Sequence, residues 1–147
     1  ESKDLLLDGI RSHFAGDADA LAEQYFHTVA SFAENPAVSL IGHFDLITKF
    51  DESNPVFRPT ARYRAAWRAA ADRLIAAGKI FEINTGAMAR GYRTFPYPSV
   101  EILEYLGKQG AKVMVSSDCH DVSTLDYAFE KGECLAKQWG CTLVDLF

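Results

Sequence analysis

The stretch Val113-Met114-Val115-Ser116-Ser117-Asp118-Cys119-His120-Asp121 decides the interpretation of this chain. Its apolar, β-forming start predicts a buried strand, and its polar end predicts that the chain emerges there onto a functional surface. Asp118 and His120 are two residues apart, so an extended backbone places both side chains on the same side. A carboxylate and an imidazole arranged in this way suit metal ligation or acid–base chemistry. The structural alternative is a turn with a helix-capping Asp and an incidental His.

Polar side chains follow two other predicted strands in a similar way. After the first strand, His43 and Asp45 again place an imidazole and a carboxylate two positions apart. Near the end of the second, Glu82 and Asn84 share one side of the strand. A hydrogen-bonded core histidine and a solvent-facing glutamate are the alternatives at these two places. The repetition of the pattern favours a shared site over these alternatives.

Helical and strand patterns alternate along the sequence. Strands are predicted at residues 38–44, 79–84, from Val113, and at 141–147, and helices after Asp17, Thr60 and Pro98 and from Ser123, which forms a capping-box pattern with Asp126. This alternation predicts an α/β fold in which right-handed crossovers join parallel strands. The three polar groups then all lie at the carboxyl ends of strands, where parallel folds place their chemistry.

A long loop is predicted at residues 85–97, directly after the strand that carries Glu82. It exceeds the usual length of such connections, which is about 2–6 residues, and long loops at this position are commonly functional. Arg90 and Arg93 lie in it, and a guanidinium suits bidentate recognition of phosphate. The alternative is a pair of exposed arginines on a loop.

Composition limits the class of protein. The chain has 147 residues, 48% apolar and 24% charged, which is typical of one globular domain. The net charge of −5 without a basic block argues against nucleic acid as a partner, and no apolar run reaches the ~20 residues that span a bilayer. Three cysteines without a C-x-x-C pair fit a reducing cytoplasm. Since Walker, G-x-G-x-x-G and G-x-S-x-G motifs are not found in the sequence, a metal site is favoured over nucleotide-binding folds and serine hydrolases.

Several ordered motifs resemble one known family over nearly the whole chain. They are Ile41-Gly42-His43-Phe44-Asp45, Glu82-Ile83-Asn84-Thr85-Gly86 and Ser117-Asp118-Cys119-His120, supported by Phe44-Asp45-Leu46-Ile47-Thr48-Lys49-Phe50 and Tyr97-Pro98-Ser99. The sequence is similar to the PHP (polymerase and histidinol phosphatase) family, and within it to bacterial histidinol-phosphatases. The resemblance implies part of a distorted (β/α)7 TIM-like barrel that binds two or three divalent metal ions, Zn, Mn or Fe.

The resemblance also implies roles for named residues. They are His43, Asp118 and His120 as metal ligands, Asp118, His120 and Glu82 as catalytic residues, Arg90 and Arg93 as phosphate-binding residues, and Asp45 and Asn84 as residues that orient the ligands. The implied reaction is hydrolysis of a small phosphate ester, most closely histidinol phosphate in histidine biosynthesis. The alternatives are a PHP phosphoesterase with another phosphate ester or nucleotide as substrate, and a non-catalytic metal-binding fragment that needs a missing half.

The sequence departs from the family pattern in one large respect. The family's H-x-H pair has no counterpart here, because no two of the four histidines have that spacing. We therefore expect residues 1–147 to form a single partial domain that corresponds to the C-terminal half of such an enzyme. We also expect little activity from this chain alone, and self-association through unfinished sheet edges.

Overall fold

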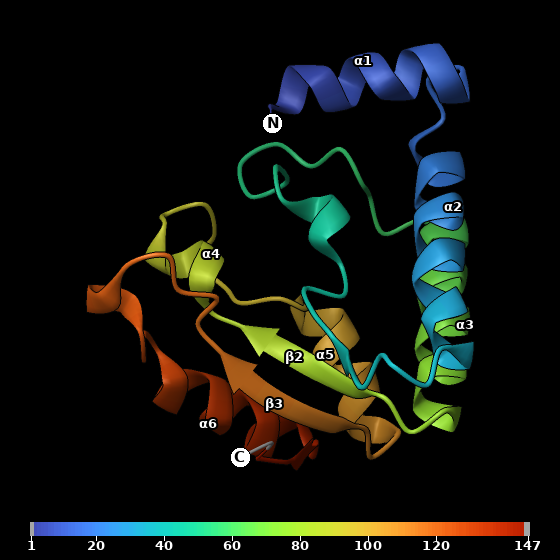
Figure 1. Ribbon diagram of the computed structural model, residues 1–147. Coiled ribbons are helices and arrows are strands. Elements are labelled where there is room, and N and C mark those ends of the chain that lie inside the picture. Colours follow the sequence, from blue (N-terminus) through green and yellow to red (C-terminus); the bar gives the residue numbers. More distant parts are fainter. Residues whose placement is uncertain (1, 146–147) are drawn as a thin grey trace.

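The computed structural model describes residues 2–145, and its helices and strands are shown in Figure 1. The α-helices are α1 (Lys3–Phe14), α2 (Ala18–Ser31), α3 (Ala61–Ala76), α4 (Gly86–Ala89), α5 (Val100–Lys108) and α6 (Phe129–Trp139). The strands are β1 (Leu40–Ile41), β2 (Ile80–Asn84), β3 (Lys112–Ser116) and β4 (Thr142–Leu143), and short 3-10 helices are η1 (Phe32–Glu34), η2 (Leu46–Thr48) and η3 (Val122–Thr124). No helix in residues 2–145 combines the length and apolar character needed to cross a membrane.

The four strands form one parallel sheet in the order β1-β2-β3-β4. β2 and β3 pair from Phe81 opposite Val113 to Asn84 opposite Ser116, whereas β1 and β4 each pair over two residues. Helices connect every successive pair of strands, as parallel pairing requires. The predicted α/β class with parallel strands is therefore confirmed, while its continuation as a TIM-like barrel remains a prediction.

One face of the sheet packs against helices and forms the core. Phe81, Ile83 and Val113 are completely buried on this face because they alternate with residues that point the other way. Their core partners include Trp67, Leu74, Ile102, Leu103 and Leu106 from α3 and α5. At α6, a Cβ added to Gly132 would come within 2.7 Å of the Val115 side chain, so this glycine allows the helix to lie directly on β3.

The pair formed by α2 and α3 lies at one end of the sheet (Figure 1). The Asp17 carboxylate accepts the N–H of Ala20 and the Thr60 hydroxyl accepts the N–H of Tyr63, so the predicted starts of both helices are confirmed. The Thr60 hydroxyl also donates to Asp19 at 2.8 Å. This contact joins the first turns of the two helices.

The first strand is shorter than the sequence predicts, since only Leu40 and Ile41 of residues 38–44 pair as a strand. The chain turns at His43, whose φ of 37° is left-handed. The N–H of His43 donates to the Glu82 side chain at 2.9 Å instead of to a neighbouring strand. A side chain of β2 therefore stabilises the turn that ends β1.

Three other predicted boundaries differ from those in the structure. The predicted 85–97 loop contains the single helical turn α4, and α6 begins at Phe129 rather than at Ser123. Asp121 accepts the N–H of Ser123 at 2.8 Å and caps the short η3, and Ala128 then has a left-handed φ of 57°. The last predicted strand is reduced to β4, and its final residues 146–147 lie outside the described part of the chain.

Candidate active site

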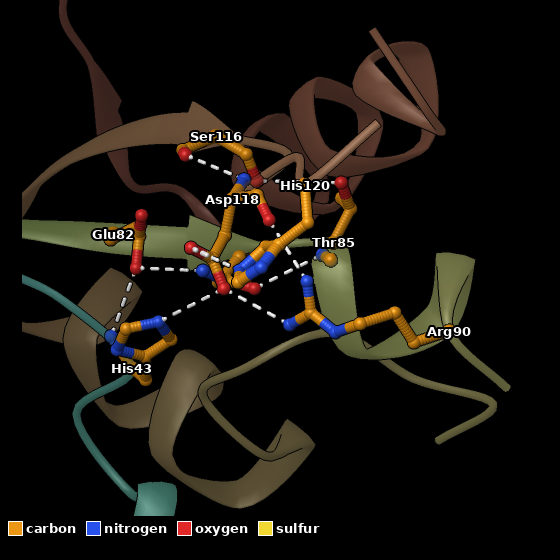
Figure 2. A network of polar contacts seen from close by, with 9 residues as sticks. His43, Glu82, Thr85, Arg90, Ser116, Asp118 and His120 are labelled. Carbon is orange, nitrogen blue, oxygen red and sulfur yellow. Dashed lines mark hydrogen bonds and ion pairs between the residues drawn. The ribbon is translucent and has the colours of Figure 1, made fainter. Parts of the chain in front are cut away.

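The predicted site residues from three strands meet at the carboxyl edge of the sheet (Figure 2). His43 lies in the turn after β1, Glu82 belongs to β2, and Asp118 follows β3 by two residues. The Nε2 atom of His43 is 3.4 Å from Oδ2 of Asp118. The parallel order of the strands therefore brings together side chains that are far apart in the sequence.

The backbone conformations of His43 and Asp118 are unusual. His43 has a φ of 37° and Asp118 a φ of 43°, a region that side chains with a Cβ rarely adopt. The N–H of Asp118 is held by the Ser116 hydroxyl at 3.1 Å, and the N–H of His43 by Glu82. Such conformations persist only where surrounding contacts enforce them, and they cluster at functional sites.

Glu82 is a buried carboxylate that supports the turn carrying His43. Besides the N–H of His43, its Oε2 accepts the Asn84 side-chain amide at 3.0 Å. A Cβ on Gly42 would lie only 3.3 Å from the same oxygen, so glycine leaves room for this contact. Asn84 in turn accepts the N–H of Gly86, the first residue of α4. The structure thus gives Glu82 and Asn84 supporting contacts, and their predicted chemical roles remain predictions.

Arg90 lies against Asp118 at the end of α4 (Figure 2). Its Nη1 donates to the backbone oxygen of Asp118 at 2.9 Å and its Nη2 to the carboxylate at 3.0 Å. Partial burial raises the pKa of Asp118, but hydrogen bonds from Arg90 and His43 outweigh this effect and leave the pKa below its usual value. Asp118 is therefore held as a carboxylate at neutral pH.

The third predicted ligand, His120, is near the same carboxylate but largely exposed. Its Nε2 is 3.7 Å from Oδ1 of Asp118, and 73% of its side chain is accessible to solvent. One carboxylate flanked by two imidazoles has the donor chemistry that zinc and similar ions prefer. Within residues 2–145, however, no group of three His, Cys, Asp or Glu side chains is arranged to hold a metal ion. The three predicted ligands converge without forming a complete metal site.

Two hydroxyl contacts that the sequence analysis missed fix the segment around Asp118. The Thr85 hydroxyl donates to the backbone oxygen of Tyr127 at 2.6 Å, and the Ser117 hydroxyl to that of Leu125 at 2.6 Å. Thr85 and Ser117 are both buried directly after a strand. A polar residue placed at the end of an apolar strand was the available signal, but the partners come from residues without a recognisable pattern.

Asp45 and Arg93 make their hydrogen bonds to residues other than Asp118. Asp45 is completely buried, and its Oδ2 accepts the N–H of Ser99 at 3.0 Å. Burial raises the pKa of Asp45, and the positive charge of Arg93 opposes this rise. Arg93 donates to the Thr48 hydroxyl at 2.8 Å. Asp45 is thus paired with a backbone amide instead of the expected imidazole, and Arg93 has different partners from Arg90.

Comparison with known proteins gives one informative similarity. The chain is 31% identical over 113 residues to a protein named probable histidinol-phosphatase from the fission yeast Schizosaccharomyces pombe (strain 972). The aligned region covers 74% of this chain and 36% of the relative, so the chain spans about a third of the length of that protein. No family model matches the chain. The chain is therefore a distant homologue of a protein named as a histidinol-phosphatase.

Proposed function

We propose that this chain provides part of the active site of a PHP-type phosphomonoester hydrolase that acts on histidinol phosphate. The name of the fission-yeast relative supports this substrate. The observation that carries the proposal is the contact of His43 with Asp118 beside Arg90, which gathers an imidazole, a carboxylate and a guanidinium at one edge of a parallel sheet. Parallel α/β folds bind their ligands at this edge.

His43, Asp118 and His120 are the residues that we assign to a divalent metal ion. Their nitrogen and oxygen donors suit Zn, Mn or Fe, and the exposed ring of His120 is free to approach Asp118 more closely. When bound, such an ion supplies a Lewis acid that neutralises charge on the phosphoryl oxygens. Glu82 contributes by holding the backbone of His43, so that the imidazole faces Asp118.

Arg90 is the residue that we assign to the substrate phosphate. Its guanidinium lies at the site and already makes two hydrogen bonds to an anionic residue, which is the geometry that also suits a phosphate group. Because only about a third of its side chain is exposed, the guanidinium has a defined direction. Substrate phosphate would compete with Asp118 for these donors.

The test combines metal binding with phosphate release. Zinc and manganese titrations of this chain should show binding that His43→Ala and Asp118→Asn weaken, whereas His27→Ala on the exposed face of α2 should leave it unchanged. Histidinol phosphate hydrolysis is then measured for this chain joined to an upstream segment that carries an H-x-H pair. A joined protein that binds metal but releases phosphate only from other esters would refute the substrate, and unchanged metal binding in both variants would refute the ligands.

A second candidate is a non-catalytic metal-binding fragment. It is favoured by the incomplete ligand set, since no three suitable side chains within the described residues form a metal-binding group. In this case the chain alone releases little phosphate, and the joined protein does no better.

A partial barrel over the whole chain also leaves β1 and β4 as short sheet edges, through which we propose self-association. Light scattering of the purified chain measures this directly, and a strictly monomeric species would contradict it.

A further inference from the structure

A series of contacts connects His43 and its turn with residues 93–99. The ring of His43 meets the ring of Tyr97 edge-on, with centroids 6.2 Å apart and planes at 85°. The guanidinium of Arg93 lies over Tyr97, 4.2 Å from the ring centroid. The imidazole is thus packed against a tyrosine whose own position is set by a buried part of Arg93.

The same series returns to the turn that carries His43. Arg93 donates to the Thr48 hydroxyl, and this hydroxyl donates to the backbone oxygen of Asp45 at 2.8 Å. Asp45, two residues after His43, is completely buried and accepts the N–H of Ser99 through Oδ2. The contacts therefore form a closed circuit between the His43 turn and residues 93–99.

We propose that Asp45 and Arg93 are positioning residues that hold the His43 imidazole in its direction toward Asp118. We call Asp45, Thr48, Arg93, Tyr97 and Ser99 the His43 clamp. The proposal rests on the proposed function in one respect only, namely the assignment of His43 to a metal ion. Its contacts and their effect on the imidazole can be measured without any substrate.

The backbone of His43 explains why such a clamp is needed. A φ of 37° is unfavourable for a residue with a Cβ, so the turn would relax if it were not held. Glu82 holds it from the preceding side by accepting the N–H of His43. Asp45 holds it from the following side through Ser99, which lies 54 residues further along the chain. The two buried carboxylates fix the turn between two separate segments.

The clamp also gives Arg93 a role different from that of Arg90. Arg90 hydrogen-bonds to Asp118 at the site, whereas Arg93 is engaged with Thr48 and Tyr97. The Nε of Arg93, Oδ1 of Asp45 and the hydroxyl of Tyr97 are all buried without a hydrogen-bond partner among residues 2–145. These three atoms are enclosed within the protein, although Arg93 as a whole is only partly buried.

The first experiment observes the imidazole by NMR in the isotope-labelled chain. Asp45→Asn removes the charge while its remaining oxygen can still accept the Ser99 N–H, and Arg93→Met removes the charge but keeps the aliphatic stem. Both substitutions should shift the ring resonances of His43 and weaken its nuclear Overhauser contacts with Tyr97. The matched control is Asp19→Asn, because Asp19 is a partly buried carboxylate that accepts a hydrogen bond from Thr60 rather than from a residue of the clamp.

Kinetics separate positioning from phosphate binding. In the joined protein described above, Asp45→Asn and Arg93→Met should lower kcat about 10- to 100-fold, the range typical of residues that orient a metal ligand, with little change in KM. Arg90→Met should instead raise KM. A rise in KM for Arg93→Met, equal to that for Arg90→Met, would assign Arg93 to the phosphate and overturn the clamp.

The outcomes distinguish the clamp from the proposed function. If the His43 resonances move in both clamp variants but histidinol phosphate is not hydrolysed by any form, the clamp stands and the proposed substrate fails. If Asp45→Asn does not fold, Arg93→Met still tests the circuit from its other side. Unmoved His43 resonances in a folded clamp variant, or equal shifts in the Asp19→Asn control, would overturn the proposal.

Discussion

His43 and Asp118 are 75 residues apart, yet both have left-handed backbone conformations and their side chains meet at 3.4 Å. Each conformation costs about 1 kcal/mol or more for a residue with a Cβ. The Glu82 carboxylate accepts the N–H of His43, and the Ser116 hydroxyl accepts the N–H of Asp118. These two conformations therefore reduce the stability of the fold, and they direct an imidazole and a carboxylate toward one point.

Asp118→Asn should separate chemistry from stability. Asn tolerates a left-handed φ well, and the Asp118–Arg90 pair is a third exposed, so we expect a loss of at most about 1 kcal/mol in the free energy of unfolding. Zinc affinity, and phosphate release by the joined protein, should fall on the order of 100-fold because the charge is lost. Urea unfolding and metal titration measure both effects. A variant that binds zinc as tightly as the original chain would remove Asp118 from the ligand set.

Gly86→Ala should destabilise the chain by about 1–3 kcal/mol, the range seen for overpacked sites. A Cβ at Gly86 would collide with the backbone oxygen of Ser117, which has little freedom to move because it directly follows β3. The matched control is Gly9→Ala in α1, where an added Cβ has open space and should stabilise the helix by about 0.5–1 kcal/mol. Thermal unfolding of the two variants should shift in opposite directions, and equal shifts would contradict this account.

Thr85→Val should loosen the segment around Asp118. The substitution keeps the shape of a buried side chain but removes the hydroxyl that donates to Tyr127, at a cost of about 1–3 kcal/mol for the oxygen left without its donor. Thr28→Val in α2 is the control, since its hydroxyl is exposed and bonds within its own helix. Hydrogen exchange of residues 117–128 should accelerate in the first variant only. Equal protection in both would mean that this hydroxyl does not fix the segment.

The pH dependence of stability should reveal Asp51. Burial raises the pKa of Asp51 above the ordinary value of 3.8, although N–H groups of Val56 and Phe57 oppose the rise. The folded chain therefore binds this proton more tightly than the unfolded chain, so the stabilisation is complete below 3.8 and is lost as pH rises through the raised pKa. The side chain introduced by Asp51→Asn does not titrate, so this variant lacks the pH-dependent contribution. Its free energy of unfolding, measured in urea between acid and neutral pH, should therefore increase relative to that of the original chain as the pH rises.

Local patterns predicted those features of the fold that depend on neighbouring residues. The caps at Asp17 and Thr60, the alternation of helices and strands, and the position of Asp118 after a strand follow from side-chain type and spacing. The predicted burial of that strand is confirmed for Val113 alone, since the rest of β3 is exposed or half-buried. The start of α6 did not follow from the local capping pattern at Ser123. The hydrogen bonds from Thr85 to Tyr127 and from Ser117 to Leu125 hold this part of the chain outside the helix, and such tertiary contacts override local preference.

The same limit applies to the site. The sequence predicted that His43 and Asp118 would share one edge, because a parallel sheet brings strand ends together. It could not predict the hydrogen-bond partners of Asp45 and Arg93. Asp45 bonds to Ser99, 54 residues away, and Arg93 bonds to Thr48, 45 residues away. Residue type predicted a carboxylate and a guanidinium near the site, but their separate surroundings depend on how the two segments pack.

The unequal pairing of the strands means that the site and the fold need not be lost together. β2 and β3 pair over four residues, whereas β1 contributes only two at the edge of the sheet. Local openings take least free energy where backbone pairing is shortest. Since His43 follows β1 and Asp118 follows β3, detachment of the edge strand would part the imidazole from the carboxylate and expose Ile41 and Phe44, while β2 and β3 stay paired. Mild warming or denaturant should therefore abolish the site through a sub-global transition, before β2 and β3 separate.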